Sequence, residues 1–424
     1  MNFNELIKNI DNGFFDGDFL KLYGETKEAK IRFKKTASGY SDSFNTKGDV
    51  FLFSAPGRTE VGGNHTDHQH GKVLAGSVNL DTIAVVCLND ENVVRIKSEG
   101  YPLDEIDLND LAAKKEEEGH AASLCRGICS FFKERGYNVS GFNAYTTSNV
   151  LKGSGLSSSA AFEVLIGNII NDLFNDGKVS AVEIAQISQK AENIYFGKPS
   201  GLLDQMASSV GGFTAIDFAD PANPVVEKID FDLAGNGYSL CIINTGGSHA
   251  NLTDSYAEIT RDMAEVSAVF GKKYLREISE EDFFNNIVEV KNKCSSRAIV
   301  RAIHFYNDNK NAELEKNALK SGDFSEFLNL ITASGNSSFK YLQNVFATSA
   351  PKEQNLSLCI CLAERYLKNK GAVRVHGGGF AGTIQCFVKN DMLNGFKEYI
   401  EKVFGENSCY VLNIRQFGGY QLKG

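Results

Sequence analysis

A run of glycines and hydroxyls in the middle of the chain has the composition of a phosphate-binding loop. It leads into an apolar helical pattern and reads Gly153, Ser154, Gly155, Leu156, Ser157, Ser158, Ser159. Glycines let a backbone approach a ligand, and free N–H groups at a helix N-terminus attract anions. The hydroxyls can donate to phosphate oxygens or bind a hard cation. We favour this function over a serine-rich linker that ends in an N-cap, and the sequence holds no G-x-x-x-x-G-K-[ST] motif.

A second polar cluster lies in the glycine-rich segment 55–71. It contains one aspartate and three histidines, namely His65, Asp67, His68 and His70. Imidazole and carboxylate groups at short spacing suit a zinc or iron site. The same groups, with Asn64, could instead exchange hydrogen bonds with a polyhydroxylated ligand. A solvated loop is the third interpretation, and local spacing alone leaves the metal and sugar interpretations open.

Two weaker motifs follow. Residues 377–382, after His376, match G-x-G-x-x-G, but the strand-like run 383–388 follows them where a dinucleotide site needs a helix. This predicts a strand connection that packs against a ligand or another loop. Asp204 lies in an apolar surrounding twelve residues after Glu192. It could act as a base or cap a helix.

Length and composition narrow the class of protein. The 424 residues suggest two or three domains, and the net charge of −9 argues against a nucleic-acid or membrane-surface partner. No apolar run is long enough to span a bilayer, and the first eighteen residues lack a signal-peptide pattern. The odd count of nine cysteines without a C-x-x-C pair predicts buried free thiols, with Cys359 and Cys361 at strand spacing. We therefore expect a cytoplasmic protein.

The elements that must position these motifs alternate between strand-like and helical patterns. The boundary of the two halves is expected near residues 211–220, and the mixed pattern indicates an α+β fold. β-Branched and aromatic residues predict strands at 49–54, 82–87, 141–147, 213–218, 239–244 and 383–388. Apolar residues at helical spacing predict helices at 158–174, 182–195, 256–270 and 353–368.

Taken in order, these motifs resemble the galactokinase branch of the GHMP kinase family over nearly the whole chain. Segment 57–67 is similar to the sugar-site signature G-R-V-N-L-I-G-E-H-T-D, 153–161 to the family's second motif, and 377–382 to its third. The resemblance implies two lobes, 1–215 and 216–424, with ligands in the cleft between them. The first lobe would resemble domain 2 of ribosomal protein S5.

The resemblance also implies a reaction and its residues. The reaction is ATP-dependent transfer of a phosphoryl group to the anomeric hydroxyl of galactose, which gives α-D-galactose 1-phosphate. Asp204 matches the catalytic aspartate and Arg58 the arginine beside the transferring phosphoryl group. Ser159 and Glu192 match the ligands of Mg²⁺. The groups implied to bind the sugar are Asn64, His65, Asp67, Gly201 and Tyr256.

This chain departs from the signature at several positions. Glu60 stands where the family has asparagine, Gly62 where it has isoleucine, and Asn64 where it has glutamate. Because that glutamate helps to hold the outer part of the sugar, a different sugar stays open as substrate: galacturonate, N-acetylgalactosamine or a pentose. A galactose sensor without catalysis and a metal-dependent hydrolase are further alternatives. The expected partners are ATP and a monosaccharide, and the oligomeric state stays open.

Overall fold

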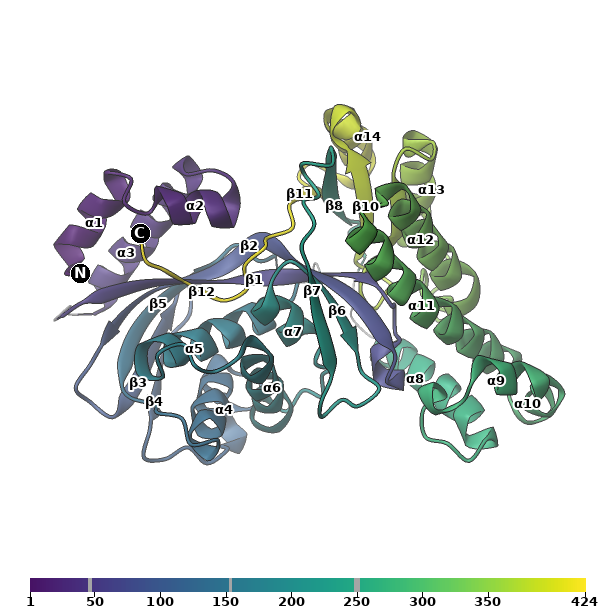
Figure 1. Cartoon of the computed structure of the whole chain (residues 1–424), viewed down its shortest axis with the longest axis horizontal. Helices are drawn as coiled ribbons and strands as arrows, with labels where there is room; N and C mark the ends of the chain where they lie inside the picture. Colours follow the sequence, from purple (N-terminus) through teal and green to yellow (C-terminus); the bar gives the residue numbers. More distant parts are fainter. Residues whose placement is uncertain (45–47, 152–154, 248–251) are drawn as a thin grey trace.

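A long twisted sheet carries the first part of the chain and a smaller sheet the second (Figure 1). The structure is a computed structural model and describes all residues except 45–47, 152–154 and 248–251. The larger sheet runs in the order β12-β1-β2-β5-β3-β4, with β6 on β2 and β7 on β6. Its strands are β1 (Val50–Gly62), β2 (Lys72–Leu88), β3 (Val93–Ser98), β4 (Leu103–Asp107), β5 (Phe142–Ser148), β6 (Phe213–Asp217), β7 (Val225–Ile229) and β12 (Tyr420–Leu422).

Strands β1 and β2 extend beyond the predicted strand segments, and β1 runs into the sugar-site signature. Their pairing shifts register between Pro56 and Arg58 and again between Glu60 and Gly62. Such irregularities bend a strand and redirect its side chains, and they are common beside active sites. The signature therefore lies partly on a bent strand end, whereas its composition alone suggested a loop.

Helices cover the larger sheet on both sides (Figure 1). One face carries α1 (Phe3–Asp11), α2 (Asp16–Tyr23) and α3 (Lys27–Ser43). The other carries α4 (Ala121–Glu134), α5 (Ser158–Phe174), α6 (Ala181–Ala191) and α7 (Leu203–Val210). Helix α5 has the predicted bounds, while the predicted helix 182–195 ends at Ala191 and continues as the π-helical turn η3 (Glu192–Phe196).

The smaller sheet is antiparallel and runs in the order β11-β8-β10-β9. Its strands are β8 (Tyr238–Asn244), β9 (Ala372–Val375), β10 (Thr383–Lys389) and β11 (Cys409–Leu412). Its helices are α8 (Thr253–Val269), α9 (Glu280–Asn285), α10 (Ile287–Lys293), α11 (Ser296–Ser321), α12 (Phe324–Ser337), α13 (Asn355–Leu367) and α14 (Leu393–Phe404). Short turns are η1 (Asp67–Gln69), η2 (Lys115–Glu117), η4 (Leu275–Glu277), η5 (Ser338–Leu342) and η6 (Asn390–Met392).

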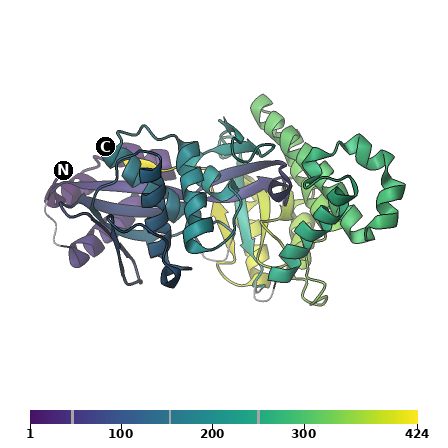
Figure 2. The same ribbon diagram turned by 90° about the horizontal axis from the view of Figure 1, so that it is seen from below.

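The two sheets lie side by side in an elongated molecule, with the larger sheet at one end and α8–α10 at the other (Figure 2). The larger sheet takes strands from both sides of residue 215, because β6 spans this residue, β7 follows it and β12 returns from the C-terminus. Both termini lie beside α1–α3 (Figure 1). The division of the chain at 215/216 stays a prediction.

The cysteines pack largely as the composition predicts. All nine lie in the described part of the chain as free thiols, and every one except Cys361 is buried. The strand spacing assigned to Cys359 and Cys361 is wrong, because both lie on α13 and point to different sides of that helix. Among the described residues, no helix combines the length and apolar character needed to cross a membrane.

Candidate active site

Arg58 and Asp204 form the centre of the site. Arg58 lies on β1 just past the first register shift, and Asp204 lies in the first turn of α7. The guanidinium donates to Asp204 Oδ1 through Nε at 2.6 Å and approaches the same oxygen through Nη2 at 2.5 Å. Its Nη1 donates to the carbonyl of Gly155 in the serine-rich loop. The pair therefore connects the sugar-site signature, the phosphate-binding loop and α7.

The surroundings of Asp204 keep its carboxylate charged. Burial raises its pKa, but the charge of Arg58 and hydrogen bonds from Ser157 and Arg58 outweigh burial, so the pKa lies below its ordinary value. Its side chain keeps 30% of its surface exposed. A charged and accessible carboxylate that an arginine orients can accept a hydrogen bond or a proton from a substrate hydroxyl. The helix-cap interpretation is not supported, because Asp204 makes these contacts from inside α7.

Ser159 and Glu192 meet as the sequence predicts. Ser159 Oγ donates to Glu192 Oε1 at 3.3 Å, and Glu192 is 1% exposed at the junction of α6 and η3. The same carboxylate accepts from Ser200 Oγ at 2.5 Å and pairs with Lys198 at 2.8 Å. A hydroxyl and a carboxylate oxygen side by side fit Mg²⁺, which takes few protein ligands and fills its shell with phosphate oxygens and water.

A cavity within the usual size range of small-molecule sites, about 300–1,000 Å³, opens beside Ser159. Its volume is ≈ 730 Å³, and its wall includes Ser158, Ser159, Asn149, Tyr101 and Phe162. Part of this wall comes from the first turns of α5, and part from Thr82 on β2 and from the C-terminal ends of β3 and β5. The cavity thus adjoins the described part of the phosphate-binding loop, while Gly153 and Ser154 lie outside the described residues.

Asp67 and Gly201 form a second part of the site. A Cβ atom at position 201 would lie 2.7 Å from Asp67 Oδ2, so the carboxylate of η1 faces the bare backbone just before α7. Only glycine leaves Asp67 this space without a shift of one of the two groups. This places a carboxylate of the sugar-site signature next to the segment that carries Asp204.

The glycine-rich hairpin between β9 and β10 closes over the signature from the smaller sheet. His65 Nε2 donates to the carbonyl of Gly378 at 3.0 Å, and Tyr256 donates to the carbonyl of Gly379 at 3.0 Å. Burial and the neighbouring His68 lower the pKa of His65 to about 3, so its ring is neutral. The third motif is therefore a strand connection packed against another loop, as its sequence predicts.

Asn64 occupies a different setting from that of the other predicted sugar ligands. It is fully buried, and its Nδ2 donates to Glu60 Oε1 at 2.8 Å and to the carbonyl of Gly377 at 2.7 Å. Its Oδ1 accepts from Ser338 at 3.1 Å and from Asn344 at 2.9 Å. Both amide hydrogens and both acceptor positions of this side chain are thus satisfied within the protein.

The three histidines of segment 55–71 do not share one site, although the rings of His65 and His68 have centroids 5.6 Å apart. His65 contacts the hairpin, while the His70 ring stacks on Tyr274 with centroids 3.7 Å apart. Within the described ranges, no three His, Cys, Asp or Glu side chains are placed to hold a metal ion. This geometry gives no support to the metal-dependent hydrolase.

Several residues of the site were not identified from the sequence. Lys198 and Ser200 hold Glu192, and Gln205 donates to Glu192 at 2.8 Å and to Glu163 at 2.9 Å. Its position next to Asp204 is the feature of the sequence that could have identified Gln205. Lys198 and Ser200 lie in an irregular segment whose sequence carries no periodic pattern.

Comparisons with known proteins agree with this arrangement. Residues 122–212 match the family model of the GHMP kinases N terminal domain, and residues 38–88 match the galactokinase galactose-binding signature. The galactokinase of Lactobacillus helveticus is 31% identical over 386 residues, which cover 88% of this chain and 94% of that one. A similar relative from Lacticaseibacillus paracasei is 29% identical over 89% of this chain and 96% of its own length.

Solved structures extend the likeness to three dimensions. The structure of Lactococcus lactis galactokinase complexed with galactose has a TM-score of 0.76 at 25% identity and covers 92% of this chain and 99% of its own. Mevalonate kinase of Methanococcus jannaschii shares the fold alone, with a TM-score of 0.61 at 14% identity over 87% of this chain and 99% of its own. The fold and the motif order thus define a GHMP kinase. Within that class, the chain belongs to the galactokinase family.

Proposed function

We propose that the protein phosphorylates galactose at its anomeric hydroxyl with ATP and releases α-D-galactose 1-phosphate and ADP. The observation that carries this proposal is the contact of Arg58 with both Asp204 and Gly155. It joins a carboxylate, an arginine and a phosphate-binding loop at the point where the sugar-site signature meets α7. The named activity of the galactokinase relatives supports the choice of reaction.

Each group has a part in phosphoryl transfer. The anomeric oxygen attacks the γ-phosphorus of ATP, the bond from that phosphorus to the β–γ bridging oxygen breaks, and ADP leaves. Asp204 orients the hydroxyl and accepts its proton, while Arg58 stabilises negative charge on the transferring group. Because the transition state is loose, positioning and charge stabilisation matter more than a strongly basic carboxylate. The lowered pKa of Asp204 fits that requirement.

Mg²⁺ is the metal that the donor set favours. Ser159 and Glu192 would hold it, and it would neutralise charge on the triphosphate. The 730 Å³ cavity beside Ser159 is the proposed place of the nucleoside. Asp67, His65 and the backbone at Gly201 are proposed to face the sugar, with Tyr256 shaping the hairpin over it. We place the reaction in the cytoplasm, where ATP is supplied and free thiols stay reduced.

The test is an ADP-release assay over a panel of monosaccharides, with the product examined by ³¹P and ¹H NMR. We expect the highest kcat/KM for galactose and a phosphate on the anomeric oxygen. Asp204→Asn serves as the matched control for ATP hydrolysis by a contaminant. Absence of sugar-dependent ADP release, as a sensor would show, or phosphate on another oxygen would contradict the proposal.

A further inference from the structure

Two departures from the family signature are a matched exchange. The signature has asparagine at the position of Glu60 and glutamate at that of Asn64, so this chain has the carboxylate and the amide in reverse order. The two side chains touch, because Asn64 Nδ2 donates to Glu60 Oε1 at 2.8 Å. One carboxylate and one amide are therefore retained, but the carboxylate now belongs to β1.

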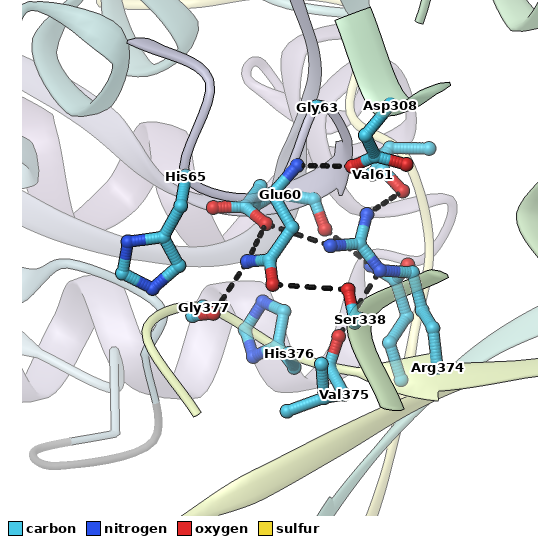
Figure 3. A network of polar contacts seen from close by, with 12 residues as sticks. Glu60, Val61, Gly63, His65, Asp308, Ser338, Arg374, Val375, His376 and Gly377 are labelled. Carbon is cyan, nitrogen blue, oxygen red and sulfur yellow. Dashed lines mark hydrogen bonds and ion pairs between the residues drawn. The ribbon is translucent and has the colours of Figure 1, made fainter. Parts of the chain in front are cut away.

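Glu60 is held firmly through one of its two oxygens. Oε1 accepts from Asn64 and from Arg374 Nη2, the latter at 2.8 Å. Arg374 has no exposed surface, and it also donates to the carbonyls of Val61 and Val375. Figure 3 shows Glu60 between these partners. A carboxylate fixed from two sides by buried donors keeps a single orientation.

The second oxygen of Glu60 is left for another partner. Among the described residues, the side-chain hydrogen bonds of Glu60 all use Oε1, and its side chain keeps 13% of its surface exposed. Arg58 and Glu60 are two residues apart on a stretch of β1 with regular pairing, so their side chains leave the same face of the strand. The charges of Arg58 and Asp67 also act on the carboxyl group of Glu60. Asn64, in contrast, has every polar position engaged by the protein.

We propose that Glu60 determines which sugar this enzyme accepts: Oε2 accepts a hydrogen bond from a sugar hydroxyl, and the carboxylate excludes sugars that carry a carboxylate. Arg374 and Asn64 are positioning residues that aim Oε2. The inference rests on the proposed sugar kinase activity and adds the recognition of neutral over acidic sugars. It assigns to Glu60 the role that the sequence alone suggested for Asn64.

The contacts of Asn64 explain why an amide suits this position beside Glu60. A carboxylate at position 64 could accept from Ser338 and Asn344 through one oxygen, but its other oxygen would face Glu60 Oε1 and the Gly377 carbonyl, which are both acceptors. Buried acceptors without donors are strongly unfavourable. An amide at position 64 supplies the missing donor, and so it is the residue that a carboxylate at position 60 requires.

The experiment compares the wild type with Glu60→Gln and Glu60→Asp on galactose and galacturonate, with ATP saturating. Gln keeps an oxygen for Asn64 and Arg374 but replaces the free acceptor with a donor, so kcat/KM for galactose should fall about 10- to 100-fold and the galacturonate-to-galactose ratio should rise by at least as much. Asp keeps the charge and shortens the reach, so it should lose galactose activity and still reject galacturonate.

A double exchange guards against loss of fold in the single variants. The double variant Glu60→Asn/Asn64→Glu restores the order of the signature. We expect it to recover the galactose activity that is lost in the single variants Glu60→Asn and Asn64→Glu. Two positions that acted independently would not show this recovery. Circular dichroism and ATP affinity verify each fold. If the wild type phosphorylates no sugar, the proposed function itself fails. If it uses galactose but Glu60→Gln leaves the sugar ratio unchanged, or if the wild type uses both sugars equally, only the role of Glu60 is overturned.

Discussion

The phosphate side and the sugar side of the site use their polar groups in different ways. On the phosphate side, Arg58 and Asp204 stay 12% and 30% exposed, and their contacts are with each other and with the serine-rich loop. On the sugar side, Asn64 and Arg374 are fully buried, whereas the side chain of Glu60 keeps 13% of its surface exposed.

The two sides differ because the phosphate side carries out the proposed phosphoryl transfer and the sugar side recognises the substrate. At Arg58, Ser159, Glu192 and Asp204 the phosphate side keeps the residue types that the family resemblance implies, because phosphoryl transfer requires a fixed arrangement of charge around one phosphorus atom. The sugar side exchanges an amide and a carboxylate while it keeps one of each. A buried network tolerates such an exchange only when donors and acceptors still match in number. Mutations on the two sides should therefore affect different quantities.

The largest effect is expected for Asp204→Asn on the phosphate side. The amide keeps the volume and one acceptor but cannot take a proton, and it loses the charge that pairs with Arg58. Turnover should fall by about 10²- to 10⁴-fold. Steady-state kinetics with galactose measure this loss, and the thermal midpoint and ATP affinity serve as controls. Near-normal turnover would show that Asp204 has no catalytic role.

Arg374→Met should show the opposite behaviour on the sugar side, with stability as the main loss. It removes a buried charge and leaves Glu60 and the carbonyl of Val61 without their donor, which costs about 3–5 kcal/mol of unfolding free energy. Urea denaturation measures the change. The pair Arg374→Met with Glu60→Gln should recover part of it, because the carboxylate left behind is then neutral. A loss below about 1 kcal/mol would contradict the expectation that the sugar side contributes more to stability than to turnover.

Glu192→Gln tests whether the phosphate side holds the metal. The neutral amide is a weaker ligand for a hard cation, so the Mg²⁺ concentration for half-maximal activity should rise about 10- to 100-fold. Magnesium titration at fixed ATP measures the shift. Lys198→Gln serves as a comparison, because it removes the ion pair to Glu192 but keeps both proposed ligands and should not raise the Mg²⁺ requirement. Elemental analysis should find little transition metal. One zinc per chain that survives dialysis and is required for turnover would contradict this assignment.

The sequence predicts the phosphate side better than the sugar side for a physical reason. The apolar spacing of 158–174 determines a helix by local interactions, and the serine-rich loop must then lie at its N-terminus. The hydrogen bonds of the Asn64 side chain, however, come from Gly377, Ser338 and Asn344, which are more than 270 residues away along the chain. No local pattern carries that information, so the burial of Asn64 emerges only from the fold.

Two further differences between the predicted and the observed elements come from contacts that the sequence does not reveal. The extension of β1 to Gly62 depends on pairing with β2, since glycines and polar residues in this segment disfavour a strand on propensity alone. The end of α6 at Ala191 depends on the π-helical turn that places Glu192 beside Ser159. Such turns occur mostly at functional sites, where tertiary contacts outweigh the regular helix.

The smallest expected effect is a pH dependence of sugar choice that isolates Glu60. Burial raises its pKa to about 7, against the opposing influence of Arg374 and Asn64. The carboxyl group is therefore mostly neutral at pH 6 and mostly charged at pH 8, whereas a sugar carboxylate is charged at both.

The galacturonate-to-galactose ratio of kcat/KM should thus fall as the pH rises from 6 to 8, by about fivefold if the two like charges repel by roughly 1 kcal/mol. The charged groups that act on Glu60 are Arg374 on β9, Arg58 on β1 and Asp67 on η1, while burial raises the pKa of the adjacent Glu315 on α11 well above its ordinary value. These groups are common to the wild type and Glu60→Gln, so the variant should give a flat ratio over the same range. A slope that persists in Glu60→Gln would assign the titration to one of those neighbours, and a flat wild-type profile would mean that the carboxyl group of Glu60 does not change its charge near pH 7.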